Sequence, residues 1–179
     1  MTRKLVISLL LGVISLLAYA DKQVDYREGY VLFQMSKSSQ SIFIQYATGY
    51  IWSHCGIVGY KGGEPYVLEA SNVVKLTPLN EFTHRRHFGI VYKCRYIDKP
   101  IKNKYKKYLG IPYDSQFSLT NSRYYCSELV WTIYKEQFGL TLCKPKPLSA
   151  YHTFGFSKLL KKRKNSSKSL FVAPSDLIY

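Results

Sequence analysis

Short apolar runs, rich in β-branched and aromatic residues and separated by Gly and Pro, recur over the first half of the chain. This pattern is typical of β-strands. The strand-like runs cover residues 30–35, 55–60, 66–70, 73–77 and 88–95, with a turn led by Pro78 before the last one. Residues 61–65 contain Gly62-Gly63 and predict a hairpin between the second and third runs. The pattern therefore predicts a sheet built mainly before the long helices.

Apolar residues at helical spacing predict helices over residues 39–48, 101–109 and 126–138. Gly49 and Gly139 follow the first and last of these segments, where glycine commonly ends a helix. The Lys- and Ser-rich residues 158–169 have the composition of a flexible loop. Strands followed by helices predict an α+β domain.

The first twenty residues have the features of a cleavable signal peptide. Arg3 and Lys4 precede an apolar run from 5 to 17, and Ala18-Tyr19-Ala20 offers small residues where signal peptidase cuts. A retained membrane anchor is the alternative, although the run is short for a bilayer span. We therefore predict a signal peptide at 1–20, a single domain at 21–179, and export to the periplasm or surface of a bacterium.

The chain is strongly basic, with a formal net charge of +15. Its cations cluster at residues 99–107 and 158–168. A field of this sign attracts polyanions. For an exported protein we expect anionic cell wall or lipid head groups rather than nucleic acid, while a solvated basic face is the alternative that needs no partner.

Three predicted elements each supply one group needed for cysteine nucleophilic catalysis. Cys126 opens the predicted helix 126–138, where the helix dipole and unpaired N–H groups favour a thiolate. His54 begins a strand, and Glu69 lies on the neighbouring hairpin strand, where its carboxylate can reach the second imidazole nitrogen. Taken singly, each residue is better explained without catalysis, His54 as a polar group at a strand end and Glu69 as a surface or ion-paired acid.

Several motifs occur in an order that resembles the YiiX-type permuted papain-like amidases, a branch of the NlpC-type cysteine peptidase superfamily. They lie at residues 28–34, 53–58, 67–70, 78–82, 112–117 and 125–130. The resemblance implies a circularly permuted papain-like (NlpC-type) fold, with an antiparallel sheet packed with helices. It also implies Cys126 at a helix N-terminus as the nucleophile, His54 as the base and Glu69 as the orienting residue. Two positions depart from the family pattern: Tyr30 stands where an Asp is usual, and Cys55 replaces a small hydrophobic residue.

The remaining cysteines and histidines carry weaker signals. Cys55 is an alternative nucleophile, but strand alternation points it away from the His54 face. Cys55 and Cys94 are expected to be buried and Cys143 to lie in a Pro-rich loop, and the sequence leaves a disulfide open. His84, His87 and His152 have no partners at metal-ligand spacing, so we expect no metal and no other cofactor.

Together these features predict an exported cysteine amidase or peptidase that works through a thioester acyl-enzyme. The resemblance and the predicted compartment favour peptidoglycan stem peptides, or related peptides and amides, as substrates. Two alternatives stay open. One is acyl transfer or ester cleavage on lipids, as in permuted relatives of the lecithin retinol acyltransferase type. The other is a non-catalytic envelope protein that binds polyanions through its basic face.

Overall fold

The structure is a computed structural model that describes residues 26–36, 38, 40–84, 91–94, 101, 103–162 and 168–178. The predicted signal peptide lies outside these residues, as do positions 163–167 of the predicted loop. None of the helices formed by the described residues is long and apolar enough to cross a membrane.

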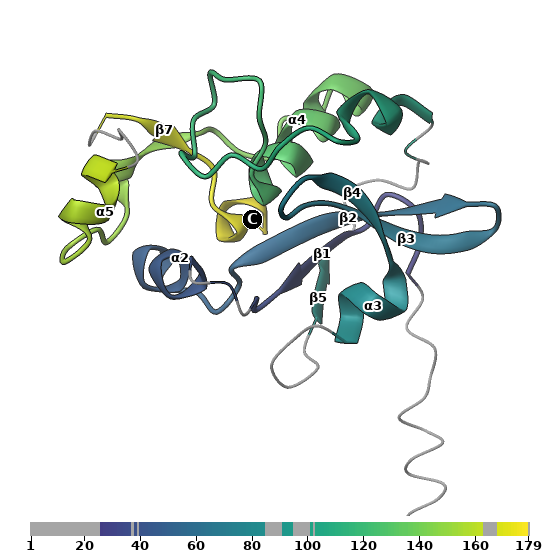
Figure 1. Cartoon of the computed structure of the whole chain (residues 1–179), viewed down its shortest axis with the longest axis horizontal. Coiled ribbons are helices and arrows are strands. Elements are labelled where there is room, and N and C mark those ends of the chain that lie inside the picture. Colours follow the sequence, from purple (N-terminus) through teal and green to yellow (C-terminus); the bar gives the residue numbers. More distant parts are fainter. Residues whose placement is uncertain are drawn as a thin grey trace, which may run out of the picture.

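A five-stranded antiparallel sheet forms the centre of the fold (Figure 1), in the order β4-β3-β2-β1-β5. The strands are β1 (Val31–Gln34), β2 (His54–Lys61), β3 (Glu64–Ala70), β4 (Val74–Pro78) and β5 (Val91–Cys94). The predicted hairpin joins β2 to β3 through Gly62 and Gly63, whose φ angles of 62° and 87° suit glycine. β2, which carries His54, therefore lies in the middle of the sheet.

Helices cover both faces of the sheet, as Figure 1 shows. The α-helices are α2 (Ser41–Thr48), α3 (Leu79–His84), α4 (Cys126–Phe138) and α5 (Ser157–Lys162). Short 3₁₀ helices are found at η1 (Asn103–Tyr108), η2 (Leu148–Ala150) and η3 (Pro174–Leu177), and β6 (Lys146–Pro147) pairs with β7 (Leu170–Phe171). The sheet thus separates α4, which packs on one face, from α3, which packs on the other.

Alternate residues of the strands supply two cores. On the α4 face, Phe33 and Ile57 pack in one buried cluster with Leu129. On the opposite face, Leu32 and Val58 pack with Phe82 of α3. All of these side chains are fully buried, and each buried aliphatic or aromatic side chain contributes about 1.5–3 kcal/mol. Because successive residues of β1 and β2 point to opposite faces of the sheet, their alternation determines which side chains face α4.

Most of the predicted elements are found where the sequence placed them, and the α+β class is confirmed. Gly49 and Gly139 end α2 and α4 with φ angles of 72° and 66°. Three predictions differ: α3 replaces the turn after Pro78, residues 103–108 form a 3₁₀ helix, and α5 occupies the start of the predicted loop. α3 and α5 are short helices that hold their form by packing Phe82 and Leu159 against the rest of the fold.

Candidate active site

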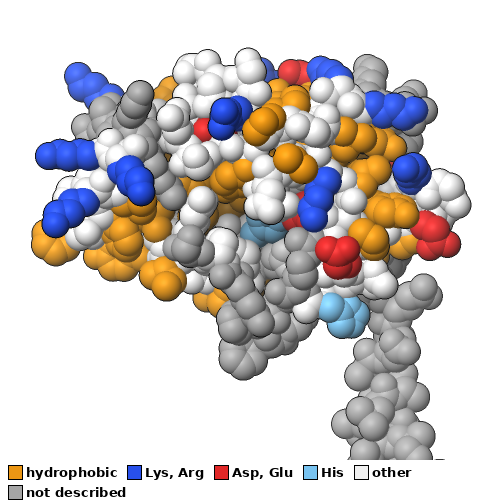
Figure 2. Space-filling model, viewed as in Figure 1, with side chains coloured by type: hydrophobic (Ala, Val, Ile, Leu, Met, Phe, Trp, Pro, Cys, Tyr) orange, Lys and Arg blue, Asp and Glu red, His pale blue; other side chains and the backbone are white. Residues whose placement is uncertain are grey.

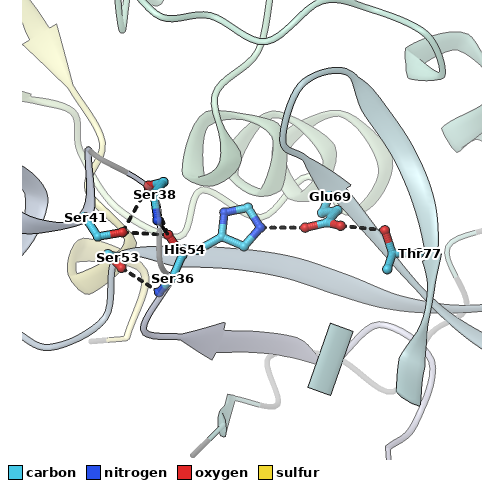
Figure 3. A network of polar contacts seen from close by, with 7 residues as sticks. All are labelled: Ser36, Ser38, Ser41, Ser53, His54, Glu69 and Thr77. Atoms are coloured by element: carbon cyan, nitrogen blue, oxygen red, sulfur yellow. Dashed lines mark hydrogen bonds and ion pairs between the residues drawn. The ribbon is translucent and has the colours of Figure 1, made fainter. Parts of the chain in front are cut away.

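The β2–β3 hairpin brings an imidazole and a carboxylate together. The register pairs Ile57 with Leu68, which places Glu69 diagonally across from His54. His54 Nε2 lies 2.6 Å from Glu69 Oε2. Thr77 of β4 donates a 2.5 Å hydrogen bond to the other carboxylate oxygen (Figure 3). Glu69 is fully buried, so its carboxylate is held from both sides in a protein interior.

Close approach of the two strands depends on Gly56. A Cβ atom at this position would lie 2.5 Å from Val67 Cγ1 and 2.9 Å from the Leu68 carbonyl oxygen. Any larger residue would have to push β3 away from β2. Because Glu69 follows Leu68 directly, the glycine preserves the His54–Glu69 distance.

Cys126 begins α4 and is hydrogen-bonded to His54. Its side chain is buried, with the residue only 2% exposed. The Cys126 sulfur also accepts hydrogen bonds from the Cys55 thiol and the Cys55 backbone N–H. Since Glu69 occupies Nε2 of His54, the nitrogen left for Cys126 is Nδ1.

These contacts favour a thiolate–imidazolium pair. The Cys55 hydrogen bond lowers the pKa of Cys126 well below its usual value, burial opposes this, and His54 lowers it further. Burial by itself would lower the pKa of His54, but Cys126 and Glu69 together raise it to about 10. Burial, followed by the nearby Cys126, raises the pKa of Cys55, which keeps that thiol protonated and able to donate.

A second polar cluster holds the chain that leads into α4. The Glu128 carboxylate accepts a 3.3 Å hydrogen bond from the backbone N–H of Tyr125. Asp114 accepts from the backbone N–H groups of Gln116 and Ser118, at 2.9 and 2.5 Å. The Tyr125 hydroxyl in turn accepts from the N–H of Val172. These bonds fix the loop before Cys126 and thus the position of its sulfur.

A cleft of about 680 Å³ opens beside His54. Most of the residues that line it have polar side chains; the lining consists of Gln34, Ser36, Ser38, Gln40, Ile44, Ser53, His54, Ala70, Ser71, Asn72, Tyr113 and Ser115. Serine hydroxyls form one wall: Ser36 Oγ lies 2.6 Å from Ser41 Oγ, and Ser53 accepts from the Ser36 N–H. In Figure 3 this wall and the Glu69–Thr77 pair lie on opposite sides of the His54 ring.

Gln34 is the buried polar residue of the cleft that lacks a full set of partners. It lies directly across from His54 in the β1–β2 pair, so the two side chains share a face. Gln34 is 3% exposed, and its Oε1 has no hydrogen-bond partner among the described residues. A buried acceptor without a partner costs about 1–3 kcal/mol. A ligand N–H in the cleft would remove that cost.

The structure brings together all three residues singled out from the sequence, Cys126, His54 and Glu69. As alternation predicted, Cys55 packs with the α4 core while the His54 ring lies beside Phe82. Cys55 nevertheless contacts Cys126, a contact that the sequence gave no reason to expect. Thr77 and Gln34 were missed, because the sequence does not show which strands pair beside Glu69 and His54.

The described cysteines Cys55, Cys126 and Cys143 are free thiols. The Cys94 side chain lies outside the described part of the structure. A second hollow, of about 750 Å³, lies between the β2–β3 hairpin and α3, and His54 does not line it. Because His54 lines the first cleft, that cleft is the candidate site.

Comparison with known proteins gives consistent matches. The model of the family described as "Permuted papain-like amidase enzyme, YaeF/YiiX, C92 family" matches residues 25–175. The YiiX protein of Escherichia coli (strain K12) is 36% identical over 131 residues, which cover 69% of this chain and 64% of that relative. The chain thus spans just under two thirds of the relative's length.

A solved structure, described as the metalloprotein YiiX from Escherichia coli O157:H7, aligns with a TM-score of 0.78 at 31% identity. The alignment covers 84% of this chain and 91% of that one. In the described part of this chain, no three His, Cys, Asp or Glu side chains gather as a metal site would require. The side chains of the described residues therefore do not form a metal site, and the chemistry below is derived from the protein groups alone.

Proposed function

Since this chain belongs to the permuted papain-like amidase family of the YaeF/YiiX type, as its motifs predicted, we propose that it is a cysteine amidase that forms a thioester acyl-enzyme. The observation that carries the proposal is the continuous line of contacts from Cys126 through His54 and Glu69 to Thr77, at the edge of an open cleft. A nucleophile, a base and an orienting carboxylate in this arrangement are the requirements of thiol catalysis.

In the proposed first step, the Cys126 thiolate attacks the carbonyl carbon of the substrate amide. The C–N bond breaks, and the His54 imidazolium gives its proton to the leaving amine. This leaves the acyl group on Cys126 as a thioester and His54 neutral. Water then gives a proton to His54 and attacks the thioester, and cleavage of the C–S bond restores the thiolate–imidazolium pair.

Glu69 and Thr77 act on this cycle through His54. The carboxylate accepts from Nε2–H, which keeps Nδ1 facing Cys126 and stabilises the imidazolium. The Thr77 hydroxyl bonds to the second carboxylate oxygen and limits rotation of the Glu69 side chain. The N–H groups in the first turn of α4, which have no acceptor within the helix, begin at Cys126 and would stabilise the oxyanion.

The polar side chains in the cleft support a substrate that carries amide groups. Serine hydroxyls and the unpartnered Gln34 oxygen suit a peptide, whose N–H and C=O groups need partners. With the predicted signal peptide, this favours peptidoglycan stem peptides, reached outside the cytoplasm. The test below distinguishes this function from two alternatives. One is a lipid acyltransferase or esterase, and the other is a non-catalytic envelope protein.

The test incubates isolated peptidoglycan with the mature wild-type protein, with Cys126→Ala and with Cys143→Ala as a matched control. Mass spectrometry identifies the soluble products. We expect stem-peptide fragments from the wild type and Cys143→Ala but none from Cys126→Ala. Release by all three proteins would contradict a role for Cys126. Release by none, with cleavage of acyl lipids, would replace the amide substrate by a lipid while leaving the thiol chemistry in place.

A further inference from the structure

Apolar side chains project into solvent at the end of the molecule formed by α2 and α5. Phe154 is 89% exposed, Ile42 is 71% exposed and Tyr46 is 48% exposed. Ile42 and Tyr46 are one helical turn apart on α2 and share a face. We call these three residues the apolar tip.

The backbone beneath the apolar tip is well supported. The Phe156 ring lies 4.9 Å from the Phe43 ring and 5.4 Å from the Tyr46 ring. The His152 N–H also bonds to the Ala47 carbonyl at 2.9 Å, which ties the chain before α5 to α2. The inward side of α2 is already filled by Phe43, Ile44 and Ala47. The tip residues therefore have no room to turn into the core.

Lysines lie beside the apolar tip, on α5 and just after it. Lys158, Lys161 and Lys162 are exposed on α5, and Lys168 is exposed just beyond it. The chain has no Asp or Glu between Glu28 and Glu64, the stretch that contains α2, and none between Glu136 and Asp176, the stretch that contains α5. Figure 2 shows hydrophobic side chains gathered over α2 and α5, with Lys and Arg side chains beside them.

We propose that this end of the protein binds the surface of an anionic phospholipid bilayer. Aromatic and aliphatic side chains next to lysines are typical of surfaces that lie in the headgroup region, where the rings enter the interface and the lysines meet phosphates. The absence of carboxylates from both stretches removes the repulsion that an anionic surface would otherwise meet. Charge complementarity thus favours lipid head groups as the occupant.

The surface lies next to the candidate active site. Gln40 and Ile44, at the start of α2, line the cleft, while Ile42 and Tyr46 of the same helix belong to the apolar tip. A protein bound through the tip would hold the cleft close to the membrane. The proposal goes beyond the amidase activity and does not depend on it, because binding is measured without turnover.

The test is sedimentation of the mature protein, its N-terminus checked by mass spectrometry, with vesicles of phosphatidylcholine alone or with one third phosphatidylglycerol. The first variant combines Lys158→Gln, Lys161→Gln and Lys162→Gln. A matched control combines Lys61→Gln, Lys75→Gln and Lys106→Gln, which removes the same charge away from the tip. A second variant is Phe154→Ser, and circular dichroism checks that every variant is folded.

We expect binding to anionic vesicles that weakens with salt. The α5 triple variant should bind about a hundred-fold more weakly, which corresponds to about 1 kcal/mol for each lysine. The vesicle affinity of the control should fall less than about three-fold. The affinity of Phe154→Ser should fall about ten-fold at low and high salt alike, because the substitution removes apolar contact with the membrane. Three outcomes would each overturn the proposal. The two triple variants could lose the same vesicle affinity, Phe154→Ser could bind vesicles as tightly as the wild type, or the protein could bind peptidoglycan but not vesicles.

Discussion

Two buried polar clusters support the candidate site, and both are built around carboxylates. In the strand cluster, Glu69 contacts the His54 ring and the Thr77 hydroxyl. In the loop cluster, Asp114 and Glu128 contact backbone N–H groups. The same side-chain chemistry therefore has two uses: one cluster orients a group that carries protons, and the other fixes the chain that presents the nucleophile.

The partners of each carboxylate explain this difference. An imidazole changes its charge near neutral pH, so a carboxylate beside it controls proton transfer. A backbone N–H does not titrate, so a carboxylate that bonds to it only stabilises a conformation. Burial is shared by both clusters, with Glu69 at 0%, Asp114 at 1% and Glu128 at 3% exposure, and cannot by itself distinguish them.

The largest expected effect comes from neutralising one carboxylate in each cluster. Glu69→Gln should lower kcat/KM about 10²- to 10³-fold, because a neutral amide no longer stabilises the imidazolium or fixes its tautomer. Asp114→Asn keeps one of the two oxygens that accept from backbone N–H groups and touches no group that carries a proton in the reaction, so its kcat/KM should fall less than about ten-fold. The measurement is steady-state kinetics on the substrate from which the wild type releases fragments. Equal losses of kcat/KM in the two variants would remove the distinction between the clusters.

The next largest expected effect is on the rate at which individual thiols are alkylated. Burial raises the pKa of Cys143 to about 11, whereas the contacts of Cys126 lower its pKa. At pH 6 we expect iodoacetamide to alkylate Cys126 about 100 times faster than Cys143, although Cys126 is the more buried, since the thiolate is the reacting form. Peptide mass spectrometry after timed quenching gives both rates from one sample.

Variants of Cys55 sharpen this measurement. Cys55→Ala removes the S–H donor and should slow alkylation of Cys126 at pH 6 about ten-fold. Cys55→Ser restores a donor at the same place and should keep most of the rate. If the Ala and Ser variants behave alike, the Cys55 hydrogen bond does not stabilise the thiolate.

The smallest expected effect is on the pH dependence of stability. Burial raises the pKa of Glu128 to about 8, the Tyr125 N–H opposes this, and Asp114 raises it further. The folded protein therefore binds this proton more tightly than the unfolded chain does, and stability is lost as pH rises from about 4.5 to about 8. Glu128→Gln should remove that loss, narrowing the difference between Tm at pH 5 and at pH 8.5 by about 2–6 °C.

Glu136→Gln is the matched control for this measurement. Lys107 and Tyr108 lower the pKa of Glu136, so its contribution has the opposite sign and is lost as pH falls. Glu136→Gln should therefore not narrow the Tm difference between pH 5 and pH 8.5. A narrowing as large as that of Glu128→Gln would show that the effect is not specific to the loop cluster.

Local sequence determined much of the fold and of the candidate site. The apolar spacing of residues 126–138 and the glycine after them predicted α4, and Gly62-Gly63 predicted the β2–β3 hairpin. These elements form where predicted because helix periodicity and turn chemistry depend on neighbouring residues alone. The order of the six motifs, three of which contain His54, Glu69 and Cys126, was likewise sufficient to identify the family.

The contacts between elements were decided only by the tertiary structure. α3 is too short for its periodicity to be visible, and it forms where Phe82 packs under the sheet. Thr77 reaches Glu69 because β4 pairs with β3, a partner choice that the sequence of β4 does not contain. Cys55 is the clearest case. Strand alternation determined its face, but only the packing of α4 on that face places its thiol against Cys126, because a contact between distant segments depends on the whole core.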